Sequence, residues 1–462
     1  MSDHNSLKTM QNLIEKYNVP GPRYTSYPTV PYWQTADFKE ELWIGSLKKA
    51  FSQTNSEKGI SLYIHLPYCE SLCTFCGCNK RITKNHAVEM PYIQALLKEW
   101  SLYAGYFDEK PIVSEIHLGG GTPTFFSAES LEKLLLGILN TVSLSKDFEF
   151  SFEGHPNNTT FGHLQKLYDL GFRRVSFGVQ DYDPIVQKAI HRIQPFEHVR
   201  KVTDWSREIG YDSISHDLVY GLPFQKLSGI IDTIEKTIAL KPDRLSFYSY
   251  AHVPWLKGNG QRGYREEDLP SAVLKRELYE TGRDLFEKAG YSEIGMDHFA
   301  LPGDKMFAAA GNQQLHRNFM GYTTSQTKVL IGLGVSSISD SWYGFAQNTK
   351  DLDKYYAMIN ANQLPVVKGH ILSDEDLVTR KQILDIMCNL SVQINEDDRD
   401  FEEKNVFMEK MADFEADGLL KMTGNNLIVT EKGKAFLRNI CMAFDKRMLR
   451  GKSEERLFSK TV

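Results

Sequence analysis

The sequence lacks several features that would place it in a membrane or on nucleic acid. It has no run of about 18 apolar residues that could span a bilayer. Its first residues, MSDHNSLKTMQNLIEKY, carry charges every few positions, unlike a secretory signal. The net charge is −5, so no overall basic field attracts nucleic acid or anionic lipid. We therefore expect a cytoplasmic protein that binds neither membrane nor nucleic acid.

Cysteine is scarce, with six residues in 462, and its distribution is uneven. A reducing cytoplasm disfavours structural disulfides. Cys388 and Cys441 stand in apolar, helical contexts and are expected to be small buried residues. The other four lie within ten residues, at positions 69, 73, 76 and 78. This cluster is the most informative feature of the chain.

The middle of the chain alternates short β-like runs with amphipathic helical stretches, which is typical of a parallel sheet built from β/α units. The expected strands are Ser61–His65, Val113–Leu118, Phe148–Glu153, Arg174–Gly178, Ser213–Val219 and Arg244–Tyr250. The expected helices are Pro91–Tyr103, Ala128–Val142, Phe161–Leu170, Pro195–Ile209 and Leu227–Leu240. Six units are too few for a closed eight-fold barrel, so an incomplete (β/α)6 barrel of the α/β class is predicted.

Three domains are expected: an N-terminal arm (1–58), the barrel with its extension (59–365) and a C-terminal domain (366–462). The arm contains the segment PGPRYTSYP at 20–28, which is too aromatic for a disordered linker and too proline-rich for a helix, so we expect it to pack on the barrel. The C-terminal domain reads as helix, helix, hairpin and helix. This order resembles a winged helix, for which we favour a structural or lid role over DNA binding, since it has no basic stripe.

The cysteine loop follows the first expected strand and reads Cys69-Glu-Ser-Leu-Cys73-Thr-Phe-Cys76-Gly-Cys78. A zinc site would usually show a second Cys or His pair, and none is present nearby. Thiolates at such short intervals are typical of iron–sulfur clusters. Cys69, Cys73 and Cys76 would hold three irons of a [4Fe–4S] cluster and leave the fourth open. Cys78 is either a fourth ligand or an active-site thiol, and its closeness to Cys76 favours the thiol.

These motifs resemble the radical S-adenosylmethionine (SAM) superfamily. The C-x₃-C-x₂-C loop carries an aromatic residue, Phe75, before its third cysteine, and the second expected strand runs into Gly119-Gly120-Gly121-Thr122-Pro123. Within that superfamily the chain is similar to the oxygen-independent coproporphyrinogen III oxidase family over nearly its whole length. The shared segments include GPRYTSYPT (21–29), CGCNK (76–80), SFGVQD (176–181), HRIQ (191–194), DLVYGLP (217–223) and HRNF (316–319).

The resemblance implies a reaction and its cofactors. The cluster would reduce SAM to a 5′-deoxyadenosyl radical, which abstracts hydrogen from propionates of coproporphyrinogen III. Two propionates would become vinyl groups, giving protoporphyrinogen IX in haem biosynthesis. An unidentified electron donor and acceptor would be partners, and we expect a monomer.

The family is described as binding two SAM molecules, and its residues carry over to this sequence. The resemblance implies one SAM beside Tyr63, Gly120, Glu153 and Ile338. It implies the second beside Phe75, Gly121, Thr122, Gln180, Arg192, Asp217 and Ala251. Cys78 and Glu153 are the candidate catalytic residues.

Arg23, with Tyr24 and Tyr27 beside it, is the candidate substrate contact, because the substrate is a flat macrocycle that carries carboxylates. The alternative is that Arg23 only pins the arm in place. Three other functions compete with the enzyme: a haem-trafficking chaperone, a structural zinc protein, and a radical enzyme with a different substrate. The arm and the Cys-Gly-Cys extension favour the oxidase over the chaperone, which resembles shorter chains without them.

Overall fold

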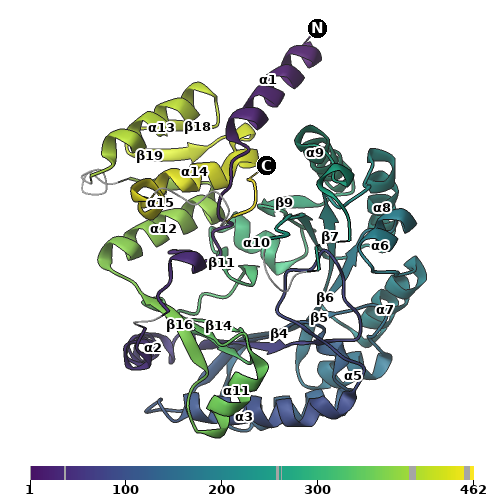
Figure 1. Ribbon diagram of the computed structural model, residues 1–462, viewed down its shortest axis with the longest axis vertical. Coiled ribbons are helices and arrows are strands. Elements are labelled where there is room, and N and C mark those ends of the chain that lie inside the picture. Colours follow the sequence, from purple (N-terminus) through teal and green to yellow (C-terminus); the bar gives the residue numbers. More distant parts are fainter. Residues whose placement is uncertain are drawn as a thin grey trace.

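The computed structural model describes residues 2–35, 38–255, 260–261, 263–394, 402–451 and 458–461, with side chains from residue 10 onward. Its centre is a parallel sheet (Figure 1). In spatial order its strands are β1 (Ile60–Leu66), β4 (Ile112–Gly120), β5 (Ser143–Gly154), β6 (Phe172–Gln180), β7 (Ser213–Tyr220) and β8 (Arg244–Ser249). All six expected strands are present.

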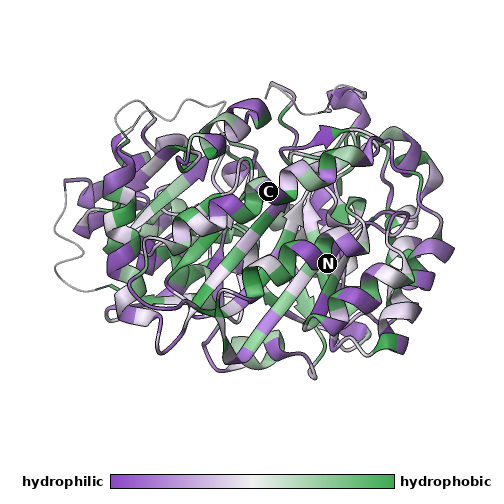
Figure 2. Ribbon diagram, turned by 90° about the horizontal axis from the view of Figure 1, so that it is seen from below, coloured by the Kyte–Doolittle hydropathy of each residue, from purple (hydrophilic) through white to green (hydrophobic). Residues whose placement is uncertain are grey.

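Helices cover the outer face of this sheet. They are α3 (Glu89–Ala104), α4 (Ala128–Leu139), α5 (Phe161–Asp169), α6 (Pro184–Ala189), α7 (Phe196–Ile209), α8 (Leu227–Ala239) and α9 (Ala272–Lys288). Each long helix buries one stripe; α4, for example, buries Leu131, Leu134, Leu135 and Ile138. Figure 2 shows the hydrophobic residues along the strands and the hydrophilic ones on the outer helix surfaces and loops.

The sheet extends beyond the six β/α units on both sides. On the β1 side lie β13 (Leu330–Leu333), β14 (Ile338–Asp340), β15 (Gly344–Asn348) and β16 (Val366–Ile371); on the β8 side lie β10 (His298–Ala300) and β9 (Ser292–Gly295). Within the described residues the strand order ends at β16 and β9, so the barrel is open, as expected. The sheet reaches residue 371, past the expected domain boundary at 365.

The remaining elements between β8 and β16 are α10 (Lys305–Gly311), β11 (His316–Asn318), β12 (Gly321–Thr323) and α11 (Leu352–Asn360). The C-terminal module contains α12 (Asp374–Asn389), β17 (Ser391–Gln393), α13 (Lys404–Ala416), β18 (Leu420–Thr423), β19 (Asn426–Val429), α14 (Leu437–Phe444) and α15 (Lys446–Arg450). Its three strands form a separate antiparallel sheet in the order β17-β19-β18. None of the described helices combines the length and apolar character needed to cross a membrane.

The N-terminal arm contacts both the barrel and the C-terminal module. The helix α2 (Glu40–Thr54) joins the barrel core, where Trp43 and Leu47 are fully buried. The preceding helix, α1 (Ser2–Tyr17), lies beside the C-terminal module (Figure 1), and Tyr17 belongs to the module's hydrophobic core. The proline-rich segment is irregular, as expected, but its tyrosines pack into that module and not onto the barrel.

Candidate active site

The cysteine loop is closed at its base by two short parallel strands, β2 (Tyr68–Cys69) and β3 (Arg81–Ile82). The Arg81 amide donates to the Pro67 carbonyl at 2.7 Å, and the Thr83 amide donates to the Cys69 carbonyl at 3.0 Å. The four cysteines are therefore carried on one loop directly after β1. The loop lies at the carboxyl end of the parallel strands, where barrel enzymes place their sites.

The glycine-rich end of β4 supports the start of this loop. The amide of Gly121 donates to the Leu66 carbonyl at 2.8 Å, and that of Thr122 donates to the Tyr68 carbonyl at 3.0 Å. A Cβ on Gly121 would lie 2.6 Å from the Pro67 carbonyl oxygen. Only glycine permits this close approach of two backbones.

We expect Gly121→Ala to displace the cysteine loop, because the atom that the new Cβ meets belongs to rigid backbone. A loss of about 1–3 kcal/mol in the free energy of unfolding is expected, with lower iron content after anaerobic reconstitution. Gly77→Ala is the matched control in the same loop, since a Cβ there meets no heavy atom within 4 Å. Equal iron content and stability in the two variants would contradict this role of Gly121.

The far side of the loop is held by the turn after α6. The Thr74 amide donates to the Ile190 carbonyl at 3.0 Å, and Arg192 Nη2 donates to the Gly178 carbonyl at 2.6 Å. Arg192 Nη1 lies 3.8 Å from the Cys73 sulfur. The buried Nε of Arg192 has no hydrogen-bond partner among the described residues, so the guanidinium retains a free donor at this cavity.

Two cavities meet at the mouth of the barrel. One, of about 190 Å³, contains all four loop cysteines and also Phe75, Gly121, Thr122, Gln180, Arg192 and Asp217. The other, of about 270 Å³, is lined by Tyr63, His65, His117, Phe319, Met320, Ser336, Ser337 and Ile338. Cys78, Gly120 and Glu153 line both. Of the residues expected to bind SAM, Tyr63 and Ile338 thus line only the larger cavity, whereas Phe75, Gly121, Thr122, Gln180, Arg192 and Asp217 line only the smaller one.

Carboxylates and histidines on the inner strand faces shape the floor of the site. Glu153 accepts from His117 Nε2 at 3.3 Å, and Asp217 accepts from Ser176 at 2.8 Å. Burial, together with the nearby Glu153 carboxylate, raises the pKa of Asp217 to about 6. Asp217 is therefore ionised at neutral pH and gains a proton under mildly acidic conditions.

The Cys76 and Cys78 thiols interact directly. Their hydrogen bond lowers the pKa of Cys76 and, together with charge repulsion and burial, raises the pKa of Cys78 well above its ordinary value. Burial raises the pKa of Cys69 to about 11, and this thiol lies 3.3 Å from the Thr122 hydroxyl. Cys76 is thus the easier of the neighbouring pair to deprotonate.

The structure places four expected residues away from both cavities: Ala251, Tyr24, Tyr27 and Arg23. Ala251 lines neither; its carbonyl accepts from Gln261 at 3.0 Å, and the same amide reaches the Phe75 carbonyl at 3.2 Å. Tyr24 and Tyr27 are each 3% exposed inside the C-terminal module, and the Tyr24 hydroxyl donates to Asp445 at 3.0 Å. These two tyrosines thus belong to the hydrophobic core of the module, and their expected contact with substrate stays a prediction. The Arg23 side chain lies at the end of β8, where its Nη2 donates to the Ser249 carbonyl at 2.5 Å.

Several site residues were missed by the sequence analysis. His65 lies on β1, and its Nε2 is 2.9 Å from the Asn79 carbonyl oxygen, which ties the strand to the cysteine loop. His117 on β4 pairs in register with Tyr63, so both face the barrel interior. Side chains alternate between the two faces of a strand, and this alternation would have indicated that both histidines face inward. Phe319 and Met320 come from a distant loop, and no local signal placed them here.

Comparisons with known proteins agree with this geometry. The family described as the radical SAM superfamily matches residues 63–237. The oxygen-independent coproporphyrinogen III oxidase of Helicobacter pylori strain J99 is 41% identical over 458 residues, which cover 97% of this chain and 98% of the relative. The chain belongs to the oxygen-independent coproporphyrinogen III oxidase family. The Escherichia coli K12 relative of the same name is 36% identical over 455 residues, covering 97% of this chain and 98% of the relative.

A solved structure extends the family relationship to the fold. The coproporphyrinogen III oxidase from Escherichia coli, described as a radical SAM enzyme, matches with a TM-score of 0.85 at 35% identity. The match covers 92% of this chain and 97% of the solved chain. Radical SAM enzymes use a [4Fe–4S] cluster and SAM, so this family membership implies both cofactors here.

The residues present suit these cofactors. Soft sulfur donors that share one cavity match the preference of iron–sulfur clusters for thiolates. Among the described side chains no three His, Cys, Asp or Glu residues form a site for a single metal ion. The unpartnered Arg192 Nε and the Glu153 and Asp217 carboxylates supply polar groups for an amino-acid and ribose moiety beside the thiols.

Proposed function

We propose that this protein oxidatively decarboxylates two propionate side chains of coproporphyrinogen III to vinyl groups, giving protoporphyrinogen IX in anaerobic haem biosynthesis. The observation that supports this most strongly is the pair of cavities that meet at Cys78, Gly120 and Glu153 beside the cysteine loop. The relatives that match almost the whole chain are named for this oxidase. An unidentified donor and acceptor exchange electrons with the site.

Cys69, Cys73 and Cys76 are proposed as the cluster ligands, with one iron left open for SAM. The Cys78 thiol lies beside Cys76 and lines both cavities, so we assign it to the reacting space and not to the cluster. When bound, the cluster supplies the electron that converts SAM into a radical able to abstract hydrogen from a propionate. The protein supplies position, orientation and exclusion of water.

Two SAM molecules would occupy the two cavities. Glu153 stands between them, and His117 orients its carboxylate through the 3.3 Å hydrogen bond. Arg192, which lines the smaller cavity, would bind a carboxylate of the SAM there. The ionised Asp217 would accept a hydrogen bond from an amino or ribose group in the same space.

Substitution of Asp217 tests that contact through its pH dependence. Because burial raises the pKa of Asp217 to about 6, its charge is lost as the pH falls through that value. We expect the wild-type KM for SAM to rise below pH 6. In Asp217→Asn the KM for SAM should be independent of pH in this range and about tenfold above the wild-type value at pH 7.5, because one charge-assisted hydrogen bond is lost.

The measurement is the KM for SAM at pH 5.5, 6.5 and 7.5. Asp212→Asn is the control, an exposed aspartate just before the same strand. A pH profile of Asp217→Asn that parallels the wild type would refute the role.

The reaction itself is tested by anaerobic reconstitution followed by assay for 5′-deoxyadenosine and protoporphyrinogen IX from coproporphyrinogen III. We expect both products in the wild type and neither in Glu153→Gln. Tight haem binding without decarboxylation would instead identify a haem-trafficking protein. Zinc without iron or acid-labile sulfide would identify a structural zinc protein.

A further inference from the structure

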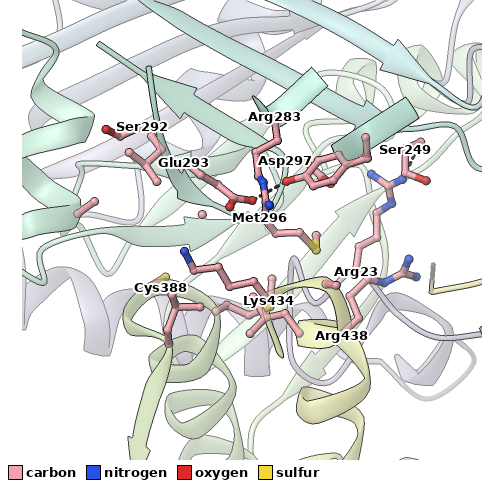
Figure 3. Close-up of a pocket in the computed structure, with 18 of the residues that line it drawn as sticks. Arg23, Ser249, Arg283, Ser292, Glu293, Met296, Asp297, Cys388, Lys434 and Arg438 are labelled. Carbon is pink, nitrogen blue, oxygen red and sulfur yellow. Dashed lines mark hydrogen bonds between the residues drawn. The ribbon is translucent and has the colours of Figure 1, made fainter. Parts of the chain in front are cut away.

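A third and larger cavity, of about 430 Å³, lies to one side of the barrel mouth. Its walls come from α9, the β9–β10 turn and α10 on the barrel side and from the C-terminal module on the other. Figure 3 shows Arg23 and Arg438 side by side at one end, with Lys434 and Cys388 rising from the module toward Ser292 and Glu293. None of the residues assigned to the cluster or to SAM lines it.

Positive charge dominates this lining, which has six basic and two acidic residues. The outer cations, Arg283 and Lys434, have ion-pair partners beyond the lining, Glu280 at 2.8 Å and Glu431 at 2.7 Å. The inner cations are Arg23, Lys275 and Arg438, and they form no ion pair among the described residues. They are held by backbone carbonyls: Lys275 Nζ lies 3.3 Å from the Tyr250 oxygen, and Arg438 Nε lies 2.9 Å from the Pro22 oxygen.

One buried carboxylate, Asp297, faces these three cations without completing an ion pair with any of them in the described structure. Burial and the neighbouring Arg23 and Arg438 lower the pKa of Lys275 to about 8. Burial and Arg23 also lower the pKa of Arg438 to about 9. Gathering like charges in a half-buried space is costly unless an anion joins them.

Part of the lining is apolar. It contains Ile294, Met296, Phe307, Met387, Leu390 and Leu437. A small inorganic anion would leave these side chains against water, whereas an amphipathic organic anion would cover them. The volume lies in the range of cavities that bind organic ligands.

A continuous set of side chains connects this cavity with the barrel interior. Tyr248 lies on β8, and its hydroxyl is 3.3 Å from His298. The His298 and Arg317 side chains both pack on the Tyr322 ring. Arg317 Nη2 lies 3.4 Å from the Arg23 carbonyl oxygen, and its Nε and Nη1 are buried without a partner in the described structure.

From this arrangement we infer that the cavity binds the propionate carboxylates at the edge of the tetrapyrrole that is not reacting, with Lys275 and Arg23 as their cationic partners. The inference rests on the proposed function, and it extends the substrate site beyond Arg23. Propionates that are not converted stay charged through both rounds of reaction, so a fixed cationic site can hold the ring while another edge faces the SAM cavities. The apolar wall covers the adjoining ring edge.

Binding of coproporphyrin III, the stable oxidised form of the ring, tests the inference through its fluorescence. The reconstituted wild type should bind coproporphyrin III at least tenfold more tightly than its tetramethyl ester in the same buffer and detergent. Lys275→Met should weaken binding of the free acid at least tenfold, and Lys275→Arg should restore it. Lys434→Met is a second variant on the opposite wall and should weaken binding several-fold. Lys288→Met is the matched control, because Lys288 lies exposed on the same helix outside the lining.

Competition identifies the ligand class, with citrate and inorganic phosphate added up to millimolar concentration. Displacement of coproporphyrin by either at micromolar concentration would overturn the inference in favour of a small-anion site. Unchanged affinity in both Lys275→Met and Lys434→Met would also overturn it. If the wild type forms vinyl product while these variants bind normally, only the inference fails. If it binds the free acid as described but forms no vinyl product, the proposed function fails and the cavity assignment stands.

Discussion

Replacing any one of Cys69, Cys73 or Cys76 by alanine should abolish the iron–sulfur absorbance and lower the rate of vinyl formation at least 1,000-fold. The three sulfurs come from one loop whose two ends are fixed by β2 and β3. The loss of one thiolate from such a loop leaves an iron without a protein donor. The measurements are iron and sulfide content per chain, the electron paramagnetic resonance spectrum of the reduced cluster and product formation.

The variant Cys78→Ala tests whether Cys78 is a cluster ligand or a thiol that faces the reacting groups. We expect this variant to retain its iron and its spectrum while it loses activity, since Cys78 lines both cavities at the cysteine loop. Cys441→Ala is the control outside the loop and should retain iron and activity, because Cys441 is buried in the core of the C-terminal module and lines none of the three cavities. Loss of iron from Cys78→Ala, equal to that of the other three, would make Cys78 a ligand and refute the three-cysteine assignment.

Glu99→Ala should lower the free energy of unfolding by about 3–5 kcal/mol at pH 6, the range for a disrupted buried polar network. Glu99 is fully buried and accepts three hydrogen bonds: from the Gly334 amide at 2.7 Å, Asn348 at 2.6 Å and Tyr355 at 2.7 Å. Alanine would leave the Gly334 amide and the Tyr355 hydroxyl without their acceptor, whereas Asn348 would keep its bonds to the Gly334 carbonyl and Ser337. Since the Gly334 segment continues into the residues that line the 270 Å³ cavity, the KM for SAM should also rise.

The loss of unfolding free energy in Glu99→Ala should depend on pH. Burial raises the pKa of Glu99 to about 7, so the folded protein holds a proton that the unfolded chain has released between about pH 4.5 and 7. Wild-type stability therefore falls as the pH rises through this window. The cost of Glu99→Ala should be smaller at pH 8 than at pH 5.

Urea unfolding at pH 5, 6 and 8 measures this dependence, with Gln94→Ala, an exposed substitution on the same helix, as control. If the loss of unfolding free energy caused by Glu99→Ala grew with pH, the raised pKa of Glu99 would be contradicted.

The parallel strands were predicted well because the sequence pattern of each strand lies within one short segment. A strand buried on both faces reads as an apolar run, and the helices that follow it show a 3.6-residue stripe. The short strands β9, β10 and β13 to β16 were missed. They have three to six residues each, and their place in the sheet depends on pairing with distant partners.

The proline-rich arm shows where composition misleads. An arginine followed by two tyrosines suggested a surface that binds a carboxylated ring, but the tyrosines lie in the core of the C-terminal module, and only Arg23 lines the cavity of about 430 Å³. Composition indicates that an aromatic side chain will be buried or bound, and only packing decides which.

The sequence by itself determined the cysteine loop, the six β/α units and the family, because each rests on residues that are close in the chain or on the alternation of short segments. The tertiary structure decided which residues share a cavity. It separated the expected SAM residues into two spaces that meet at Glu153, moved Tyr24 and Tyr27 into a hydrophobic core, and brought Arg23, Lys275 and Arg438 together from three distant segments. These associations depend on long-range packing, which leaves no periodic signal in the sequence.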